Sequence, residues 1–166
     1  MAPATLVVVM RRVQLSTQLD ASMADVVAAV ERLDTLRRLT RGLLAIDSAG
    51  SAPLPQQWPT DGSPVVMRVR PFHLPVGWLH TIRLIEVDAV GGRVRTEEGG
   101  GAIRRWSHTV DIEPVTPRRC RYTDTIDIDA GGLTLPVWAW ASVFYRVRQR
   151  RLRQLAIDLH ERAPTA

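Results

Sequence analysis

The sequence predicts an α+β fold in which a curved, seven-stranded antiparallel sheet wraps around one long C-terminal helix. Apolar and polar residues alternate through most of residues 64–129, and this period of two is typical of half-buried strands. Short turns rich in glycine and proline separate the alternating segments, so we expect consecutive strands to pair antiparallel. After Gly131 and Gly132 the apolar residues repeat with helical spacing instead.

The N-terminal part of the chain predicts a strand, two short helices and a brief second strand. Alternation from Arg12 to Leu19 indicates the first strand. Ser22, followed three residues later by Asp25, resembles a capping box at the start of the first helix. Asp34 offers a cap for the second helix, and Gly42 ends it. The expected segments are a strand at 12–19, helices at 23–33 and 35–40, and a strand at 43–46.

Residues 48–63 form a long loop rich in proline, glycine, serine and glutamine, and Trp58 lies inside it. Loops of this length are usually functional or mobile. The indole either folds back over the body of the protein as a lid or projects from it at a contact. We expect the lid.

After the loop we expect five further strands, at 65–72, 78–87, 93–98, 103–113 and 119–129. The long helix follows them at 135–160. Most of the helix arginines, including Arg146, Arg150 and Arg153, lie opposite its apolar stripe. A strongly bent sheet that grips one helix cannot be filled completely by side chains, so we expect a cavity between sheet and helix.

Three strands direct polar-tipped side chains toward this interior. The first pattern places Trp78 and His80 on one face, and the second places Trp106 and His108 there. On the last strand, the shared face carries Tyr122, Asp124, Ile126 and Ile128. We expect Trp78, Trp106, Trp138, Phe144 and Tyr145 to wall the cavity, since flat rings with a polar tip suit a planar ligand that carries a few oxygens.

The motifs that carry a resemblance are Gly77-Trp78-x-His80, Arg104-Arg105-Trp106-x-His108 with Glu113-Pro114 after it, Tyr122-Thr123-Asp124, and the terminal Arg-rich helix. With the order of elements, they resemble the SRPBCC superfamily of START-related, helix-grip proteins from residue 12 to 160. This superfamily includes bacterial polyketide cyclase/dehydrase-like proteins and pollen-allergen-type ligand carriers. The resemblance implies that a hydrophobic small molecule binds between sheet and helix, and a minority of members are cyclases, aromatases or hydrolases. The long loop around Trp58 and the weak second strand depart from the usual pattern.

His108 and Asp124 are the candidate catalytic pair. If Glu113 pairs with Arg119, the antiparallel register places His108 opposite Asp124, within hydrogen-bonding reach. A buried carboxylate beside an imidazole suits a general base. Alternatively, the two side chains only satisfy each other in the core.

His80 lies two strands from His108, at a backbone distance of about 10 Å. This is wide for a shared metal ion, and no close His or Cys spacing indicates a zinc site, so we expect neither metal nor cofactor. Arg148 falls within the apolar stripe of the last helix. It must either extend past the sheet edge or reach into the cavity toward Asp124, Glu86 or an anionic ligand.

Composition narrows the class of protein. The net charge is +5, but all 22 basic residues are arginine and no nucleic-acid-binding motif accompanies them. The apolar run 6–10 is too short for a signal peptide, and no run is long enough to span a membrane. The single cysteine, Cys120, is expected on the outer face. We expect one cytoplasmic domain over 1–166, as a monomer or homodimer.

Three functional hypotheses remain from the sequence. The first is a binder of a hydrophobic, aromatic or lipid-like small molecule. The second is a polyketide cyclase or aromatase, in which His108 with Asp124 moves protons and Arg148 or His80 polarises a carbonyl. The third is a membrane-peripheral lipid-transfer module that uses the helix arginines and Trp58. In the first, the wall is Trp78, Trp106, Tyr122, Phe144 and Tyr145, and the polar anchors are His80, His108, Asp124 and Arg148.

Overall fold

The computed structural model describes residues 10–72 and 74–162, so the apolar run 6–10 lies outside the described residues except for Met10. Its strands are β1 (Arg11–Leu19), β2 (Leu44–Ser48), β3 (Val65–Pro71), β4 (Trp78–Asp88), β5 (Arg93–Gly100), β6 (Ile103–Thr116) and β7 (Arg119–Asp129). Its helices are α1 (Met23–Val30), α2 (Leu33–Thr40), the short η1 (Gly131–Leu133) and α3 (Thr134–Arg162). Among these helices, none combines the length and hydropathy needed to cross a bilayer.

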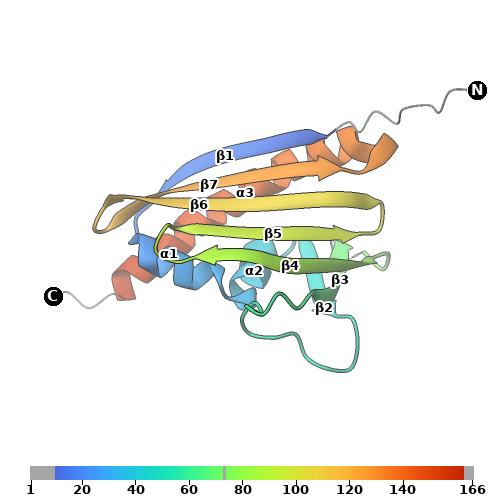
Figure 1. Cartoon of the computed structure of the whole chain (residues 1–166), viewed down its shortest axis with the longest axis horizontal. Coiled ribbons are helices and arrows are strands. Elements are labelled where there is room, and N and C mark those ends of the chain that lie inside the picture. Colours follow the sequence, from blue (N-terminus) through green and yellow to red (C-terminus); the bar gives the residue numbers. More distant parts are fainter. Residues whose placement is uncertain (1–9, 73, 163–166) are drawn as a thin grey trace, which may run out of the picture.

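The strands form one antiparallel sheet in the order β1-β7-β6-β5-β4-β3-β2. Every pair of neighbouring strands is consecutive in sequence except β1 with β7. Short turns connect the strands from β3 onward, and the long loop connects β2 to β3. The long helix α3 lies behind β1, β7 and β6 in Figure 1, on the same side of the sheet as α1 and α2. The predicted fold class is confirmed.

Helix α3 has 29 residues and is therefore about 43 Å long. Its buried side chains face the sheet, while Arg146, Arg150 and Arg153 are exposed, as the helical period predicted. Its buried apolar residues are Ala141, Phe144, Tyr145, Leu152, Leu155 and Ala156.

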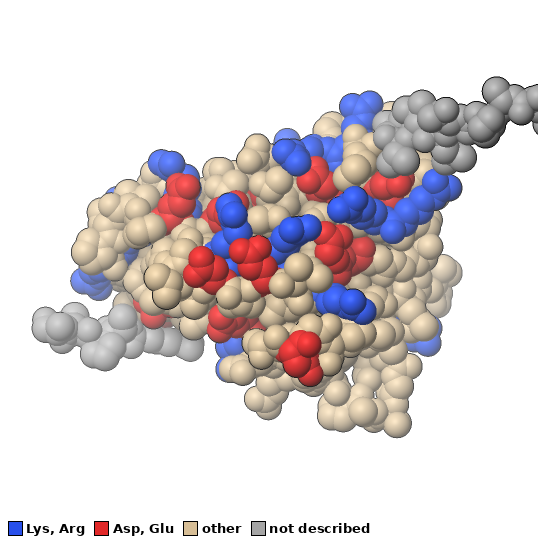
Figure 2. All heavy atoms as spheres, in the orientation of Figure 1, with Lys and Arg blue, Asp and Glu red and all other residues tan. Residues whose placement is uncertain are grey.

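The outer face of the sheet carries charge of both signs. Figure 2 shows basic and acidic side chains interspersed over the strands. Cross-strand ion pairs account for part of this pattern: Arg12 contacts Asp127 at 2.8 Å, and Arg93 contacts Asp111 at 2.7 Å. Opposite charges facing each other across strands are a usual device of a solvated sheet face.

The junction of α1 and α2 differs from the prediction. Helix α1 ends at Val30, three residues before the expected end, and α2 begins at Leu33 with Arg32 as its N-cap. The predicted cap, Asp34, lies in the first turn instead. The long loop causes the break, because the Leu33 amide donates to the Gln56 carbonyl and Arg32 bridges to Gln57. These bonds replace the continuation of the first helix.

The β6–β7 register also differs, by two residues. Glu113 lies opposite Arg121 rather than Arg119, because β6 continues to Thr116 and only residues 117–118 form the turn. A bulge beside Pro114 accommodates the extra length. A shift of two residues leaves every side chain on its predicted face, so the inner-face residues were assigned correctly.

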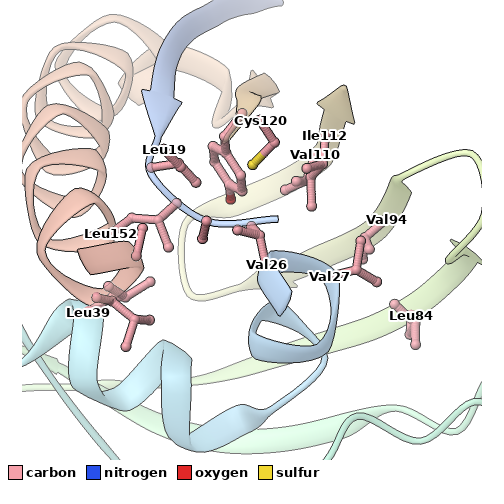
Figure 3. Close-up of a cluster of buried hydrophobic side chains, with 14 residues drawn as sticks. Leu19, Val26, Val27, Leu39, Leu84, Val94, Val110, Ile112, Cys120 and Leu152 are labelled. Carbon is pink, nitrogen blue, oxygen red and sulfur yellow. The ribbon is translucent and has the colours of Figure 1, made fainter. Parts of the chain in front are cut away.

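Cys120 was predicted on the outer face, and this prediction is wrong. It lies two residues from Tyr122 and therefore shares the inner face with it, fully buried. In Figure 3 its side chain lies among Leu19, Val110 and Ile112 in the core near α1. Burial raises the pKa of the thiol to about 11, so the thiolate is scarce at neutral pH.

Candidate functional site

A cavity of about 120 Å³ lies between the sheet and the helices. Side chains from all three α-helices, the long loop and strands β2 to β6 line it, and most are apolar. For comparison, an apolar hollow of roughly 150 Å³ in another protein holds one benzene ring. The volume is therefore of the order needed for a single aromatic ring. The aromatic side chains of the wall are Trp58, Trp78, Trp106, Trp140, Phe144 and Tyr145.

Seven of the nine predicted site residues line this cavity: Trp78, His80, Trp106, His108, Phe144, Tyr145 and Arg148. The other two, Tyr122 and Asp124, are fully buried one layer behind His108 and Arg148, which they contact. Trp138, expected in the wall, donates instead from Nε1 to the Arg12 carbonyl at 2.9 Å. It belongs to the packing of α3 against β1.

The rings of the wall pack against one another. Phe144 stacks on Trp140 with ring centroids 4.9 Å apart, and its edge meets Tyr145 at 5.3 Å. Tyr145 in turn meets His108 edge to face at 5.2 Å. Such offset and edge-on contacts are the preferred aromatic geometries. They fix one end of the cavity wall on a rigid helix.

His108 and Asp124 form the buried pair that the sequence predicted. Nε2 of His108 lies 2.7 Å from Oδ1 of Asp124, and because a carboxylate only accepts, the imidazole donates. The contact is diagonal, since His108 lies opposite Ile126 and Asp124 lies opposite Val110. The expected hydrogen bond between His108 and Asp124 is therefore present, although the predicted register, with these two residues directly opposite each other, is wrong.

Asp124 receives more than this one hydrogen bond. The Tyr122 hydroxyl donates to Oδ1 at 3.1 Å, and Gln149 donates to Oδ2 at 3.0 Å from α3. Burial raises the pKa of the Asp124 carboxyl, but the charge of Arg148 and the hydrogen bonds from His108 and Gln149 outweigh burial and hold it below its ordinary value. The carboxylate therefore stays ionised at neutral pH.

Glu98 is the site residue that sequence reasoning missed. It lies on β5 between the two histidines: His80 Nε2 is 3.1 Å from its Oε2, and His108 Nδ1 is 3.9 Å from its Oε1. Thr96 donates to the same Oε1 at 2.9 Å. Burial raises the Glu98 pKa, but His80, His108 and Thr96 together lower it below the ordinary value. Alternation from Val94 would have placed Glu98 on the inner face.

Arg148 reaches into the cavity rather than past the sheet edge, the other direction that the sequence left open. It is only 8% exposed, and Nη2 donates to the Tyr122 hydroxyl over a long 3.3 Å. Its guanidinium lies 5.2 Å from the centre of the Tyr145 ring. Burial lowers the Arg148 pKa, but the surrounding groups, Asp124 among them, raise it above its usual value, so the charge persists. Glu86, a possible partner from the sequence, is exposed instead.

Trp58 folds back over the body of the protein, as expected. Its indole is partly buried against two core clusters and lines the cavity. Its backbone amide donates to the Glu31 carbonyl at 3.1 Å, which ties the loop to the end of α1. The loop therefore forms part of the cavity wall.

The titratable groups bind one another in pairs rather than around a common centre. Within residues 10–72 and 74–162, no three His, Cys, Asp or Glu side chains are arranged to hold a metal ion. The two pairs are His80 with Glu98 and His108 with Asp124. This arrangement suits hydrogen bonding and proton transfer.

No protein-family profile matches the sequence, and no curated protein matches it either. Solved structures do match. The protein TTHA0849 from Thermus thermophilus superposes with a TM-score of 0.65 at 14% identity, covering 89% of this chain and 98% of that one. Norcoclaurine synthase from Thalictrum flavum, in complex with dopamine and hydroxybenzaldehyde, superposes with a TM-score of 0.56 at 15% identity over 87% of each chain.

A third match is the di-domain ARO/CYC BexL from the BE-7585A biosynthetic pathway, with a TM-score of 0.65 at 14% identity. It covers 92% of this chain and 48% of that one, so a single stretch of BexL corresponds to this fold. At such identities the likeness establishes the fold and not the activity. The chain therefore has the helix-grip fold that its motifs predicted.

Proposed function

We propose that this protein binds a small aromatic molecule in the cavity between its sheet and α3. The observation that supports this function best is the composition of the cavity wall: six aromatic side chains line a space of about 120 Å³, comparable to that of one ring. A few polar groups are concentrated among them, chiefly His80, Glu98, His108 and Arg148. Apolar walls with a few placed polar groups are typical of small-molecule sites.

The fold gives independent support. Norcoclaurine synthase, which has the same fold, was solved with dopamine and hydroxybenzaldehyde, each of which contains a single aromatic ring. In our proposal, Trp78, Trp106, Phe144 and Tyr145 contact the ring of the ligand. His80, His108 and Arg148 contact its polar substituents, with Asp124 and Tyr122 holding these groups from behind.

A cavity-filling variant tests the proposal. Val94 is 7% exposed and lines the cavity, so the larger ring of Val94→Phe occupies the space proposed for the ligand. Toluene or phenol should raise the melting temperature of the wild type, and this shift should disappear in the variant. Val143→Phe on the exposed face of α3, where Val143 is 61% exposed, is the matched control and should keep the shift. An equal shift in Val94→Phe would contradict the proposal.

Acid–base catalysis is the second candidate function, and the His108–Asp124 hydrogen bond favours it. With Nε2 donating to Asp124, the neutral imidazole keeps its lone pair on Nδ1. His108 also lines the cavity, so Nδ1 would accept a proton from a carbon next to a ligand carbonyl. Both Asp124 and Glu98 would then stabilise the imidazolium. This is the proton transfer that a cyclase or aromatase requires.

Deuterium exchange into phenylacetone, followed by NMR, measures this step without knowledge of the natural substrate. We expect the protein to accelerate the exchange, and His108→Ala and Asp124→Asn to slow it by about 10²–10⁴-fold. Both variants should still bind toluene. Exchange at the uncatalysed rate in the wild type would exclude this chemistry for benzyl ketones of one ring and leave the binding function intact.

A further inference from the structure

Arg148 has too few acceptors for its hydrogen-bond donors. A guanidinium carries five N–H groups. Among the described residues, the only hydrogen bond it makes is the 3.3 Å contact to Tyr122, and its buried Nε has no partner. Asp124 compensates its charge from a distance, without a direct hydrogen bond to it. The hydrogen-bonding arrangement is therefore incomplete for a guanidinium that is 8% exposed.

The two buried carboxylates do not share this shortage. Asp124 accepts from His108, Tyr122 and Gln149, and Glu98 lies within hydrogen-bonding distance of both His80 and Thr96. The negative groups of the site are therefore already satisfied by the protein. The cation alone has capacity left over.

Two other unused groups of the cavity wall are donors. Nε1 of Trp78 and Nε1 of Trp106 are buried without a hydrogen-bond partner among the described residues, and an indole N–H donates and cannot accept. Within the same residues, His80 Nδ1 is also buried without a partner, and it is an acceptor when Nε2 donates to Glu98. With Arg148, the unused donors outnumber this acceptor, so a complementary ligand must supply acceptor oxygens.

Resting on the proposed function, we infer that the ligand is a monocyclic aromatic carboxylate whose carboxylate pairs with Arg148. Two parallel N–H···O bonds between a guanidinium and a carboxylate match in geometry and are stronger than bonds between neutral groups. Tyr145 lies against both the guanidinium and His108, so the aromatic ring of the ligand binds beside Phe144 and Tyr145. The cavity volume of about 120 Å³ is close to that occupied by one aromatic ring, so we infer a single ring.

Binding must also overcome the charge of the site. Asp124 and Glu98 carry two negative charges against the one positive charge of Arg148. Asp124 is fully buried behind the wall, whereas Glu98 and Arg148 both line the cavity. A ligand carboxylate must therefore bind against the guanidinium and away from Glu98, whose oxygens lie against His80 and Thr96.

The test compares benzoate, benzamide and toluene, which share one ring and differ in the polar group. Titration calorimetry at pH 7 should show that the wild type prefers benzoate over benzamide by about tenfold or more. Arg148→Gln should abolish this preference while toluene still binds. Arg150→Gln, on the exposed face of the same helix, is the matched control and should keep the preference.

Each outcome is decisive. Equal or weaker binding of benzoate than of benzamide by the wild type overturns the inference, and so does an undiminished preference in Arg148→Gln. If Arg148→Gln does not fold, Arg148→Lys replaces it, because lysine keeps the charge but lacks the planar donor pair of arginine. Arg148→Lys should reduce the preference for benzoate over benzamide, and an unchanged preference overturns the inference. Binding of toluene with no binding of benzoate refutes the carboxylate alone, whereas failure of all three ligands refutes the proposed function.

Discussion

Replacement of Asp124 by asparagine should strongly destabilise the protein, although the two side chains have nearly the same shape. The carboxylate is fully buried and accepts hydrogen bonds from His108, Tyr122 and Gln149. Asparagine has one acceptor oxygen, and its amide N–H groups face donors. A buried donor left unsatisfied costs about 1–3 kcal/mol, and a buried charge that loses its counter-charge costs about 3–5 kcal/mol. We expect the free energy of unfolding to fall by about 3–5 kcal/mol.

Urea denaturation followed by tryptophan fluorescence measures this change. Asp127→Asn is the control, because Asp127 lies on the same strand but on the outer face, and it should leave the midpoint nearly unchanged. The double variant Asp124→Asn/Arg148→Met removes the buried cation as well and should recover at least about 1 kcal/mol relative to additivity. The reasoning is refuted if Asp124→Asn behaves like the control, or if the two substitutions in the double variant are simply additive.

Three other predictions concern pH, thiol reactivity and backbone strain. The folded-state pKa values of Asp124 and Glu98 are lowered, so their contribution to stability is complete above the ordinary carboxyl pKa of about 4. This contribution is lost as the pH falls through the lower folded-state values. Glu98→Gln should therefore flatten the acid limb of a plot of melting temperature against pH, and an unchanged limb would argue against this. Cys120 is fully buried, and its pKa is raised to about 11. Ellman's reagent should therefore react with it only at urea concentrations that unfold the protein. Rapid reaction of the native protein would place the thiol at the surface. Gly92 has φ +70°, and an added Cβ would lie 2.1 Å from a backbone carbonyl oxygen of β6. Gly92→Ala should therefore lower the free energy of unfolding, measured by urea denaturation, by more than about 2 kcal/mol. Gly50 has open space around it, so Gly50→Ala should be neutral, and equal stability of the two variants would count against the strain.

Sequence periodicity predicted the strands, the helices and the inner face of the sheet because these follow from the alternation of apolar residues. It did not predict the β6–β7 register, since that depends on how far a strand continues past Pro114 before it turns. The hydrogen bond between His108 and Asp124 was nevertheless anticipated, because an error of two residues preserves the face.

Glu98 escaped notice for a different reason. It is the last residue of the predicted strand 93–98, and its face was not assigned, while the structure continues β5 to Gly100. The position of Cys120 followed from the same alternation that was applied correctly to Tyr122, and its assignment to the outer face was inconsistent with that pattern. The volume of the cavity and the single hydrogen bond of Arg148 depend on three-dimensional packing, which alternation does not describe.

The pairing of acids with imidazoles gives the interior two adjoining units rather than one cluster. His80 and Glu98 form one unit on β4 and β5, and His108 and Asp124 form the other on β6 and β7. The units meet where His108 Nδ1 lies 3.9 Å from Glu98 Oε1. Loss of one member removes a buried hydrogen bond from its partner and changes the charge beside the other unit, so natural sequences of this fold should exchange both members of a unit together.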